Sequence, residues 1–171
     1  MSADRAATIL ARFNAAHTSL VNRLRDLPAG AAEQRPGPDA WTAAQIGCHV
    51  ALTNEWIAAV LTGSTPMAEP APAGFCEQFN PSGLPERLKT YPPLEPPNPV
   101  SREVALERLR TSGQHMSKAI ASLAPERGGG YTVTLPFGTL SLFELADFSA
   151  AHVSRHCNQL ERTVGARTAT A

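Results

Sequence analysis

The sequence predicts an all-α protein: a four-helix bundle with a long proline-rich crossover between helices two and three and a short extended segment before helix four. Apolar side chains recur at helical spacing in four stretches of about twenty residues or more. Two of these stretches begin with capping boxes, and only one short stretch alternates as a strand does. Long helices without a sheet to cover bury their apolar faces against one another, which favours a bundle.

The composition is that of one globular domain. With 171 residues, 43 % of them hydrophobic, the chain can bury a full core, so we expect a single domain over residues 1–171. Fifteen basic residues balance fifteen acidic ones without long runs of either sign, which argues against nucleic-acid and membrane partners. Charges interrupt the N-terminal stretch, and no apolar run is long enough to span a membrane, so we expect a cytoplasmic protein. Three cysteines without C-x-x-C spacing argue against a disulfide framework or a zinc ribbon.

The first helix is predicted over residues 3–27. Its apolar stripe has bundle-type spacing and consists of Ile9, Phe13, Leu20, Leu24 and Leu27. His17 lies at or near this stripe, where packing or hydrogen bonding is the expected role. Prolines and glycines in residues 28–38 end the helix and form a connection.

The second helix is predicted over residues 43–62. Thr42 and Gln45 form a T-x-x-Q capping box at its start, and Gly63 ends it. His49 occupies a position on its apolar face where a core hydrophobe is expected. A lone histidine at such a position is more often a core residue with a hydrogen-bond partner than a metal ligand.

A proline-rich segment, residues 64–100, follows the second helix and holds ten of the fifteen prolines. Proline at this density removes amide donors and breaks helices, so we expect irregular, partly polyproline structure. A connection of this length is either a surface loop or a lid or binding loop. Its apolar side chains are expected to anchor it on the bundle: Phe75, Phe79, Leu84, Leu88 and Tyr91.

The third helix is predicted over residues 102–124 with Ser101 as its cap. Its stripe consists of Leu106, Leu109, Met116, Ile120 and Leu123. His115 lies beside this stripe and is expected at the surface or boundary. Residues 126–130 are glycine-rich and read as a flexible joint, and the alternation in residues 131–140 predicts a short extended segment or small hairpin.

The fourth helix begins at a capping box formed by Ser141 and Glu144. Within it His152 and His156 stand four residues apart, so that their rings lie over one another on one helix face and can reach one divalent ion. Such a pair also arises by coincidence in a core or on a surface, so by itself it is only half of a site.

The predicted topology brings a third histidine to this pair. The 37 residues of segment 64–100 can run the length of a bundle, which allows helices two and three to be parallel and helices two and four antiparallel. At 1.5 Å per residue, His49 then lies roughly 10 Å from the start of helix two and His156 roughly 10 Å from the far end of helix four. The three imidazoles converge from two helices, an arrangement that bundles build in their interior.

Two stretches together resemble the DinB/YfiT-like superfamily of metal-binding four-helix bundles. These are WTAAQIGCHVALTNEW and, about a hundred residues later, LPFGTLSLFELADFSAAHVSRHCNQLER. The family pattern is one histidine on helix two and an H-x3-H on a later helix. The resemblance spans nearly the whole chain and implies that His49, His152 and His156 are metal ligands. The long proline-rich segment departs from the shorter members of the family.

Three neutral histidines on Zn²⁺, Ni²⁺ or a similar divalent ion leave a position for water or substrate, which is the form of a catalytic site. What the resemblance implies about activity is divided. Some relatives are thiol-dependent transferases and isomerases that use low-molecular-weight thiols such as mycothiol or bacillithiol, and others are described as metal-dependent hydrolases. The alternative is a non-catalytic bundle that binds a small molecule or a protein and holds a structural or vestigial metal. We expect a small-molecule substrate, and a homodimer follows by family analogy alone.

Several polar residues lie near the predicted ligands. Glu55, Asp147 and Gln159 are candidates to orient a ligand imidazole or to bind substrate, with a helix-surface position as the simpler reading. Cys48 and Cys157 adjoin two ligands in sequence but point about 100° away on the helix, so we expect small core residues. The two basic residues of this region are candidates to recognise an anionic substrate or are ordinary solvated residues: Arg155 and Arg162.

Overall fold

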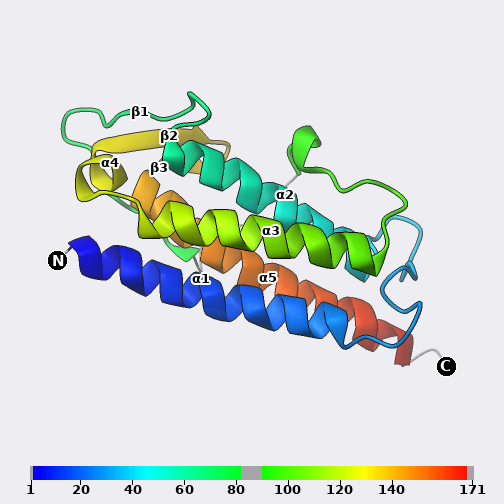
Figure 1. Ribbon diagram of the computed structural model, residues 1–171. Helices are drawn as coiled ribbons and strands as arrows, with labels where there is room; N and C mark the ends of the chain where they lie inside the picture. Colours follow the sequence, from blue (N-terminus) through cyan, green and yellow to red (C-terminus); the bar gives the residue numbers. More distant parts are fainter. Residues whose placement is uncertain (1, 82–89, 169–171) are drawn as a thin grey trace.

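The computed structural model describes residues 2–81 and 90–168, and these form a mostly helical protein with a small sheet (Figure 1). Its long helices are α1 (Ser2–Arg25), α2 (Ala43–Thr62), α3 (Arg102–Ala121) and α5 (Leu142–Thr168). The shorter elements are α4 (Pro125–Gly130), the 3₁₀ helix η2 (Pro92–Leu94) and the strands β1 (Glu69–Pro70), β2 (Tyr131–Leu135) and β3 (Gly138–Ser141). The prediction of a mostly helical protein is confirmed.

The four long helices lie side by side. In Figure 1, α1 and α5 run in one direction, and α2 and α3 run in the other. Helix α2 packs against α3 and α5, and α1 packs against the same two helices. Because α2 and α5 are antiparallel, the beginning of α2 lies at the same end of the molecule as the later turns of α5.

The core consists of the apolar stripes of these helices. The side chains of Ile9, Phe13, Leu20 and Leu24 on α1 are buried, as are Leu109, Met116 and Ile120 on α3. Helix α1 ends at Arg25 and α3 at Ala121, each a little before the predicted end. Leu27 therefore follows α1 in the connecting turn and is half-buried. Within the described residues, no helix combines the length and the apolar character needed to cross a membrane.

The predicted helix starts are confirmed by their hydrogen bonds. The amide of Gln45 donates to Thr42 Oγ1 over 3.1 Å, and the amide of Thr42 donates to Gln45 Oε1 over 3.1 Å. At α5, the amide of Glu144 donates to Ser141 Oγ over 3.0 Å, and the amide of Ser141 donates to Glu144 Oε2 over 2.9 Å. Gly63 ends α2 with a left-handed φ of 83°, a conformation that glycine adopts without strain.

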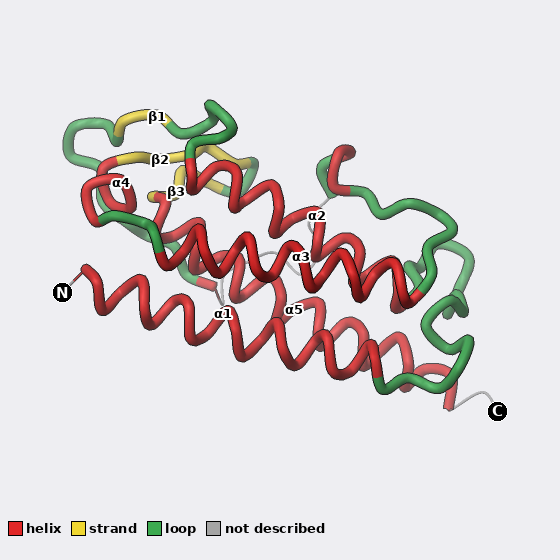
Figure 2. The backbone as a smooth tube through the Cα atoms, in the orientation of Figure 1, coloured by secondary structure: helices red, strands yellow, loops and turns green. Residues whose placement is uncertain are grey.

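The three strands and α4 gather at the end of the molecule where α5 begins (Figure 2). Strands β2 and β3 form the predicted hairpin, with Val133 opposite Leu140. Strand β1 pairs antiparallel with β2 through Glu69 and Thr132. This strand lies in the proline-rich segment, where only irregular structure was expected. Glu69 is not a proline and its backbone is free to join the exposed edge of the hairpin, so that prediction is wrong for this short stretch.

The glycine-rich stretch 126–130 is not a flexible joint, because it forms helix α4. Pro125 occupies the first turn of α4, where a proline is compatible with a helix. Arg127 projects from α4 and donates to the carbonyls of Leu61 over 2.8 Å and Val60 over 3.1 Å, which are among the last of α2. Gly128 is buried against the Phe143 ring. Tertiary contacts thus overcome the low helix propensity of glycine.

Only part of the proline-rich segment is anchored as predicted. The ring of Phe79 packs against Phe148 on α5, with ring centroids 6.1 Å apart. Tyr91 is 59 % exposed, so its prediction as an anchor is wrong. Tyr91 immediately precedes η2, and in this short turn it is Leu94 that lies toward the helices and is half-buried. Leu84 and Leu88 lie outside the described residues.

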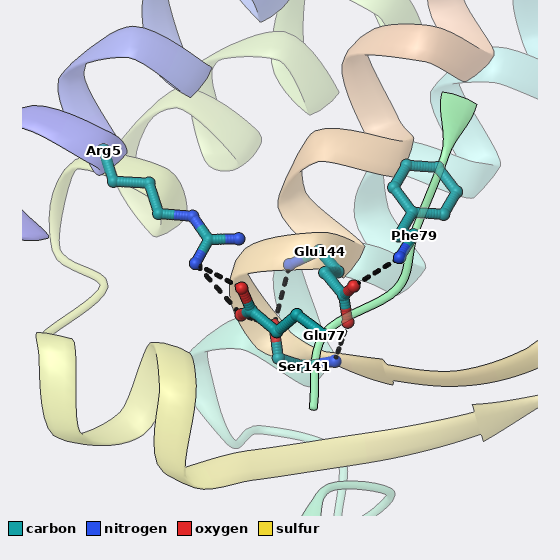
Figure 3. Close-up of polar contacts among 5 residues, drawn as sticks. All are labelled: Arg5, Glu77, Phe79, Ser141 and Glu144. Atoms are coloured by element: carbon teal, nitrogen blue, oxygen red, sulfur yellow. Dashed lines mark hydrogen bonds and ion pairs between the residues drawn. The ribbon is translucent and has the colours of Figure 1, made fainter. Parts of the chain in front are cut away.

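Two carboxylates fasten the segment to the start of α5, and we call this group the polar latch (Figure 3). Glu77 accepts hydrogen bonds from Arg5 Nη1 over 2.7 and 3.0 Å and from the hydroxyl of Ser141. Glu144 accepts from the amide of Phe79 over 2.5 Å through Oε1 while its Oε2 caps Ser141. The latch joins α1, the proline-rich segment and α5.

Candidate metal centre

The three histidines singled out by the sequence meet between α2 and α5. His49 lies in the second turn of α2, and His152 and His156 lie one turn apart on α5. His152 Nε2 is 3.2 Å from His49 Nε2 and 3.1 Å from His156 Nε2. One nitrogen from each ring falls within 4.8 Å of the other two. The rings are nearly inaccessible to solvent, with exposed fractions of 5 % for His49, 9 % for His152 and 8 % for His156.

Two of the rings are oriented by hydrogen bonds on their outer side. His49 Nδ1 donates to the carbonyl of Leu94 over 2.9 Å, and His156 Nδ1 is 2.7 Å from Gln159 Oε1. A carbonyl oxygen only accepts, so Nδ1 of a neutral His49 carries the proton and Nε2 carries a lone pair. The same reasoning applies to His156 and the Gln159 amide oxygen. Two lone pairs therefore point at the centre of the cluster.

The third ring is held differently. His152 Nδ1 is buried and has no hydrogen-bond partner among the described residues. Phe148, on the same helix, packs beside it, with its ring centroid 5.6 Å from that of His152 at an interplanar angle of 38°. Among the described residues, this imidazole is therefore held by packing against neighbouring rings and not by a hydrogen bond at its outer nitrogen.

Burial keeps the three imidazoles neutral at physiological pH. It lowers the pKa of His49, although the Leu94 hydrogen bond opposes this effect. Burial also lowers the pKa of His156 to about 3, with a further contribution from neighbouring His49. The pKa of His152 falls well below its ordinary value, first through burial and then through His156, His49 and Arg155. Neutral imidazole is the form that binds a metal ion.

The metal-free protein is expected to lose stability as the pH falls from about 6.5 toward 3. An unfolded histidine has a pKa of about 6.5, whereas folded His156 has a pKa of about 3. Between these values only the unfolded chain binds the proton, so the free energy of unfolding falls by up to about 1.4 kcal/mol per pH unit for this group. Above about pH 6.5 its contribution is fully present.

Urea denaturation of the metal-free protein at pH 7.5 and 5.5 measures this effect, with His156→Leu as the matched control. The variant lacks the group, so its stability should change less between the two pH values than that of the wild type. Equal pH dependence of the two proteins would contradict the assignment of a depressed pKa to His156.

The cluster fits a divalent transition metal. Histidine nitrogens bind Zn²⁺ at about 2.0–2.1 Å, which in tetrahedral geometry separates two ligand nitrogens by about 3.3 Å. The two separations that involve His152 Nε2, 3.1 and 3.2 Å, are close to this value, and all three ligand nitrogens lie within 4.8 Å of one another. The Leu94 carbonyl and the Gln159 amide oxygen each accept from the outer nitrogen of a ring and so leave its inner nitrogen with a lone pair, as oxygen acceptors beside metal-bound histidines usually do. Three buried histidines with this geometry could hold a metal ion.

Of the candidates to orient a ligand, only Gln159 lies at the cluster, where its amide oxygen contacts His156. Glu55 instead pairs with His115 Nδ1 over 3.0 Å at the exposed junction of α2 and α3. Asp147 forms an ion pair with Arg12 on α1. Glu55 shares α2 with His49, and Asp147 shares α5 with His152 and His156. Successive residues of a helix are rotated by about 100°, so both carboxylates point toward other helices and not toward the cluster.

Cys48 and Cys157 are small buried residues, as predicted. Cys48 Sγ lies 3.7 Å from Arg108 Nη1, and Cys157 Sγ lies 3.4 Å from Ser19 Oγ. Burial raises the pKa of the Cys48 thiol, which opposes a role as a thiolate ligand. Arg155 is half-buried near the cluster, and Arg162 is exposed farther along α5. His17 stacks on Phe13, with ring centroids 5.4 Å apart, and takes no part in the cluster.

Sequence reasoning missed three groups at the site. The ring of Trp41 lies 4.9 Å from that of His49, the Leu94 carbonyl accepts from His49, and Phe148 packs on His152. Phe148 precedes His152 by four residues, a spacing that could have indicated the contact. No sequence signal marks Leu94, because every residue carries a backbone carbonyl.

A cleft of about 480 Å³ opens beside the site, on the side of Trp41 and Gln45. Its walls come from the connection before α2 and from the second half of the proline-rich segment, including Arg35, Asp39 and Glu95. A larger cleft of about 690 Å³ lies between α2 and α3, around the Glu55–His115 pair. Neither cleft is lined by the three histidines.

One comparison with known proteins gave a match, and it covers the site. The family model described as the DinB superfamily matches residues 12–160, which include all three histidines. No curated protein and no solved structure matches the chain.

Proposed function

Because the chain belongs to the DinB superfamily, we propose that it is a metal-dependent enzyme whose divalent transition-metal ion is held by His49, His152 and His156. Residues 1–171 then constitute one DinB-type domain, and the four long helices are its four-helix bundle. Zn²⁺ and Ni²⁺ are the ions best matched to three neutral imidazoles. The cytoplasmic location, the small-molecule substrate and a homodimer stay predictions.

One observation carries the proposal: three Nε2 atoms converge while the outer nitrogens of two rings are occupied. In the absence of a cation, two lone pairs and a third imidazole would face one another inside the protein. His152 Nε2–H can donate fully to only one of its two neighbours, so one buried acceptor would stay poorly satisfied. A cation at the centre satisfies all three nitrogens at once.

Three protein ligands leave room in the coordination sphere for a water, a thiolate or a substrate oxygen. A metal held in this way supplies Lewis acidity and lowers the pKa of a bound thiol or water. The chain's own residues supply the rest. The Leu94 carbonyl and the Gln159 amide keep two ligand rings in register, and the buried surroundings exclude bulk water from the imidazoles. This chemistry serves transfer to or from a low-molecular-weight thiol, or hydrolysis.

The second candidate is a non-catalytic bundle whose metal is structural or vestigial. The observation that favours it is the burial of the ligands, none of which is more than 9 % exposed. A catalytic metal must admit a substrate, whereas a structural site closes its coordination sphere with protein. The two candidates therefore differ in whether an external molecule reaches the metal.

A titration of the Co²⁺-substituted protein separates them. Co²⁺ replaces Zn²⁺ and reports its ligands by visible absorption, so azide and 2-mercaptoethanol serve as probes. If the site is catalytic, both probes should change the visible spectrum, and the thiol should add a sulfur-to-metal band in the near ultraviolet. A spectrum that neither probe alters would favour the structural metal. His49→Ala is the control, and it should give no spectrum of the bound ion.

A further inference from the structure

The three histidines differ in what fixes their orientation. A metal-bound histidine usually donates its outer N–H to an oxygen acceptor, which sets the ring's rotation. His49 and His156 have such acceptors in Leu94 and Gln159. His152 Nδ1 is fully buried without one among the described residues. Another contact must fix the ring that lies between the other two.

Phe148 makes that contact. It stands one helical turn before His152 on α5, and it is only 6 % exposed. Its ring centroid is 5.6 Å from the imidazole of His152. Two further rings confine it: Phe79 at 6.1 Å in an edge-to-face arrangement and Phe137 at 5.1 Å. A ring packed in this way has little freedom to rotate, so it restricts the imidazole beside it.

Phe79 is itself held in place by the polar latch. Its amide donates to Glu144, and Glu77, two residues earlier, is bound by Arg5 and Ser141 (Figure 3). Glu144, Phe148, His152 and His156 follow one another at intervals of four residues on α5. One face of α5 therefore carries, in order, the latch, the aromatic contact and two of the clustered histidines.

We infer that Phe79 and Phe148 are positioning residues of the metal centre, with Phe79 acting through Phe148 to hold the His152 imidazole toward the ion. This inference rests on the proposed function, since it assumes that the three histidines bind a metal. It also assigns a role to the proline-rich segment. The segment contacts one of the three histidines directly, through the Leu94 carbonyl at His49, and reaches a second one indirectly, through the Phe79 ring packed on Phe148.

Metal affinity of four proteins tests the inference: wild type, Phe79→Ala, Phe148→Leu and Phe75→Ala. Phe75 is the matched control, because it is half-buried in the same segment and makes no aromatic contact within the described residues. Competition with a chromophoric chelator gives the Zn²⁺ affinity. Loss of an outer positioning group costs roughly 10- to 100-fold in metal affinity. We therefore expect Phe79→Ala and Phe148→Leu to bind Zn²⁺ about tenfold more weakly than the wild type. The control Phe75→Ala should bind Zn²⁺ as tightly as the wild type.

The inference also predicts how the effects of the Phe79 and Phe148 substitutions combine. Because Phe79 acts through Phe148, the double variant should bind Zn²⁺ about as weakly as Phe148→Leu alone, not about a hundredfold more weakly than the wild type. The Co²⁺ spectrum provides a readout that a general loss of stability does not move. It should change shape in Phe148→Leu as the imidazole reorients, and stay unchanged in Phe75→Ala.

The outcomes separate this inference from the proposed function. A wild type that binds no metal overturns the proposed function and the inference with it. A wild type that binds metal, with Phe79→Ala and Phe148→Leu binding equally well, overturns the inference alone. Equal losses in Phe79→Ala and Phe75→Ala would also overturn it, since the effect would then belong to the whole segment. Should Phe148→Leu fail to fold, the half-buried Phe79→Ala still decides the question.

Discussion

The variant His152→Ala is expected to lose metal binding while keeping its helices. His152 is the middle member of the cluster, with its Nε2 3.2 Å from that of His49 and 3.1 Å from that of His156. In the proposed site this substitution removes a ligand outright, so the metal affinity should fall by more than the roughly 10- to 100-fold that an outer partner contributes. The fold should survive because the substitution also removes a buried nitrogen that has no partner among the described residues.

Chelator competition measures the affinity of this variant, and far-ultraviolet circular dichroism measures its helix content. His115→Ala is the control: it removes a histidine that is exposed at the junction of α2 and α3 and paired with Glu55. The control should bind metal as the wild type does. Unaltered binding by His152→Ala would show that the ligand set is wrong, and wholesale unfolding would indicate a structural metal.

Gly128→Ala should destabilise the protein strongly. A Cβ at this position would lie 2.4 Å from Phe143 Cε2 and 2.6 Å from its Cδ2 and Cζ. The ring has little room to retreat, because it is 3 % exposed and the Arg5 guanidinium lies 4.7 Å from its centroid. Overpacking of this kind costs about 1–3 kcal/mol, and in a protein of this size each kcal/mol lowers the melting temperature by about 2–4 °C.

Gly129→Ala is the matched control for this substitution. It lies next to Gly128 in α4, and a Cβ there would have no heavy atom within 4 Å. Alanine is the better helix former by about 1 kcal/mol, so the control should melt at or slightly above the temperature of the wild type. Thermal melts of the two variants that coincide would mean that Phe143 does not pack on α4 as described.

Much of the helical framework could be predicted because its signals are local. The reciprocal bonds of Thr42 with Gln45 depend on residues three positions apart, as do those of Ser141 with Glu144. The end of α2 likewise depends on one glycine with a positive φ. Such features can be recognised in a sequence because the interacting groups are neighbours along the chain.

What could not be predicted depends on contacts between distant segments. Helix α4 forms in a glycine-rich stretch because Arg127 donates hydrogen bonds to backbone carbonyls near the C-terminal end of α2 and because Gly128 packs against the Phe143 ring. Strand β1 exists because the β2 edge is available to Glu69. Local propensity argues against both elements, and tertiary packing decides.

The candidate site, too, could be predicted only in part. The juxtaposition of His49 with His152 and His156 followed from helix spacing and an antiparallel α2–α5 pair. The groups that orient these rings were harder to foresee, since one is a backbone carbonyl supplied from 45 residues away along the chain. The Glu55 and Asp147 carboxylates lie close enough along their helices to be candidate partners of these rings. The directions of their side chains show instead that Glu55 pairs with His115 and Asp147 with Arg12.

The metal content of untagged protein tests the central claim most directly, because a histidine tag would itself carry metal. Elemental analysis should find close to one equivalent of a transition metal per chain, and this amount should fall sharply in His49→Ala and His152→Ala. Protein that contains no metal, and that also takes up no added Zn²⁺ or Ni²⁺ at neutral pH, would contradict the account.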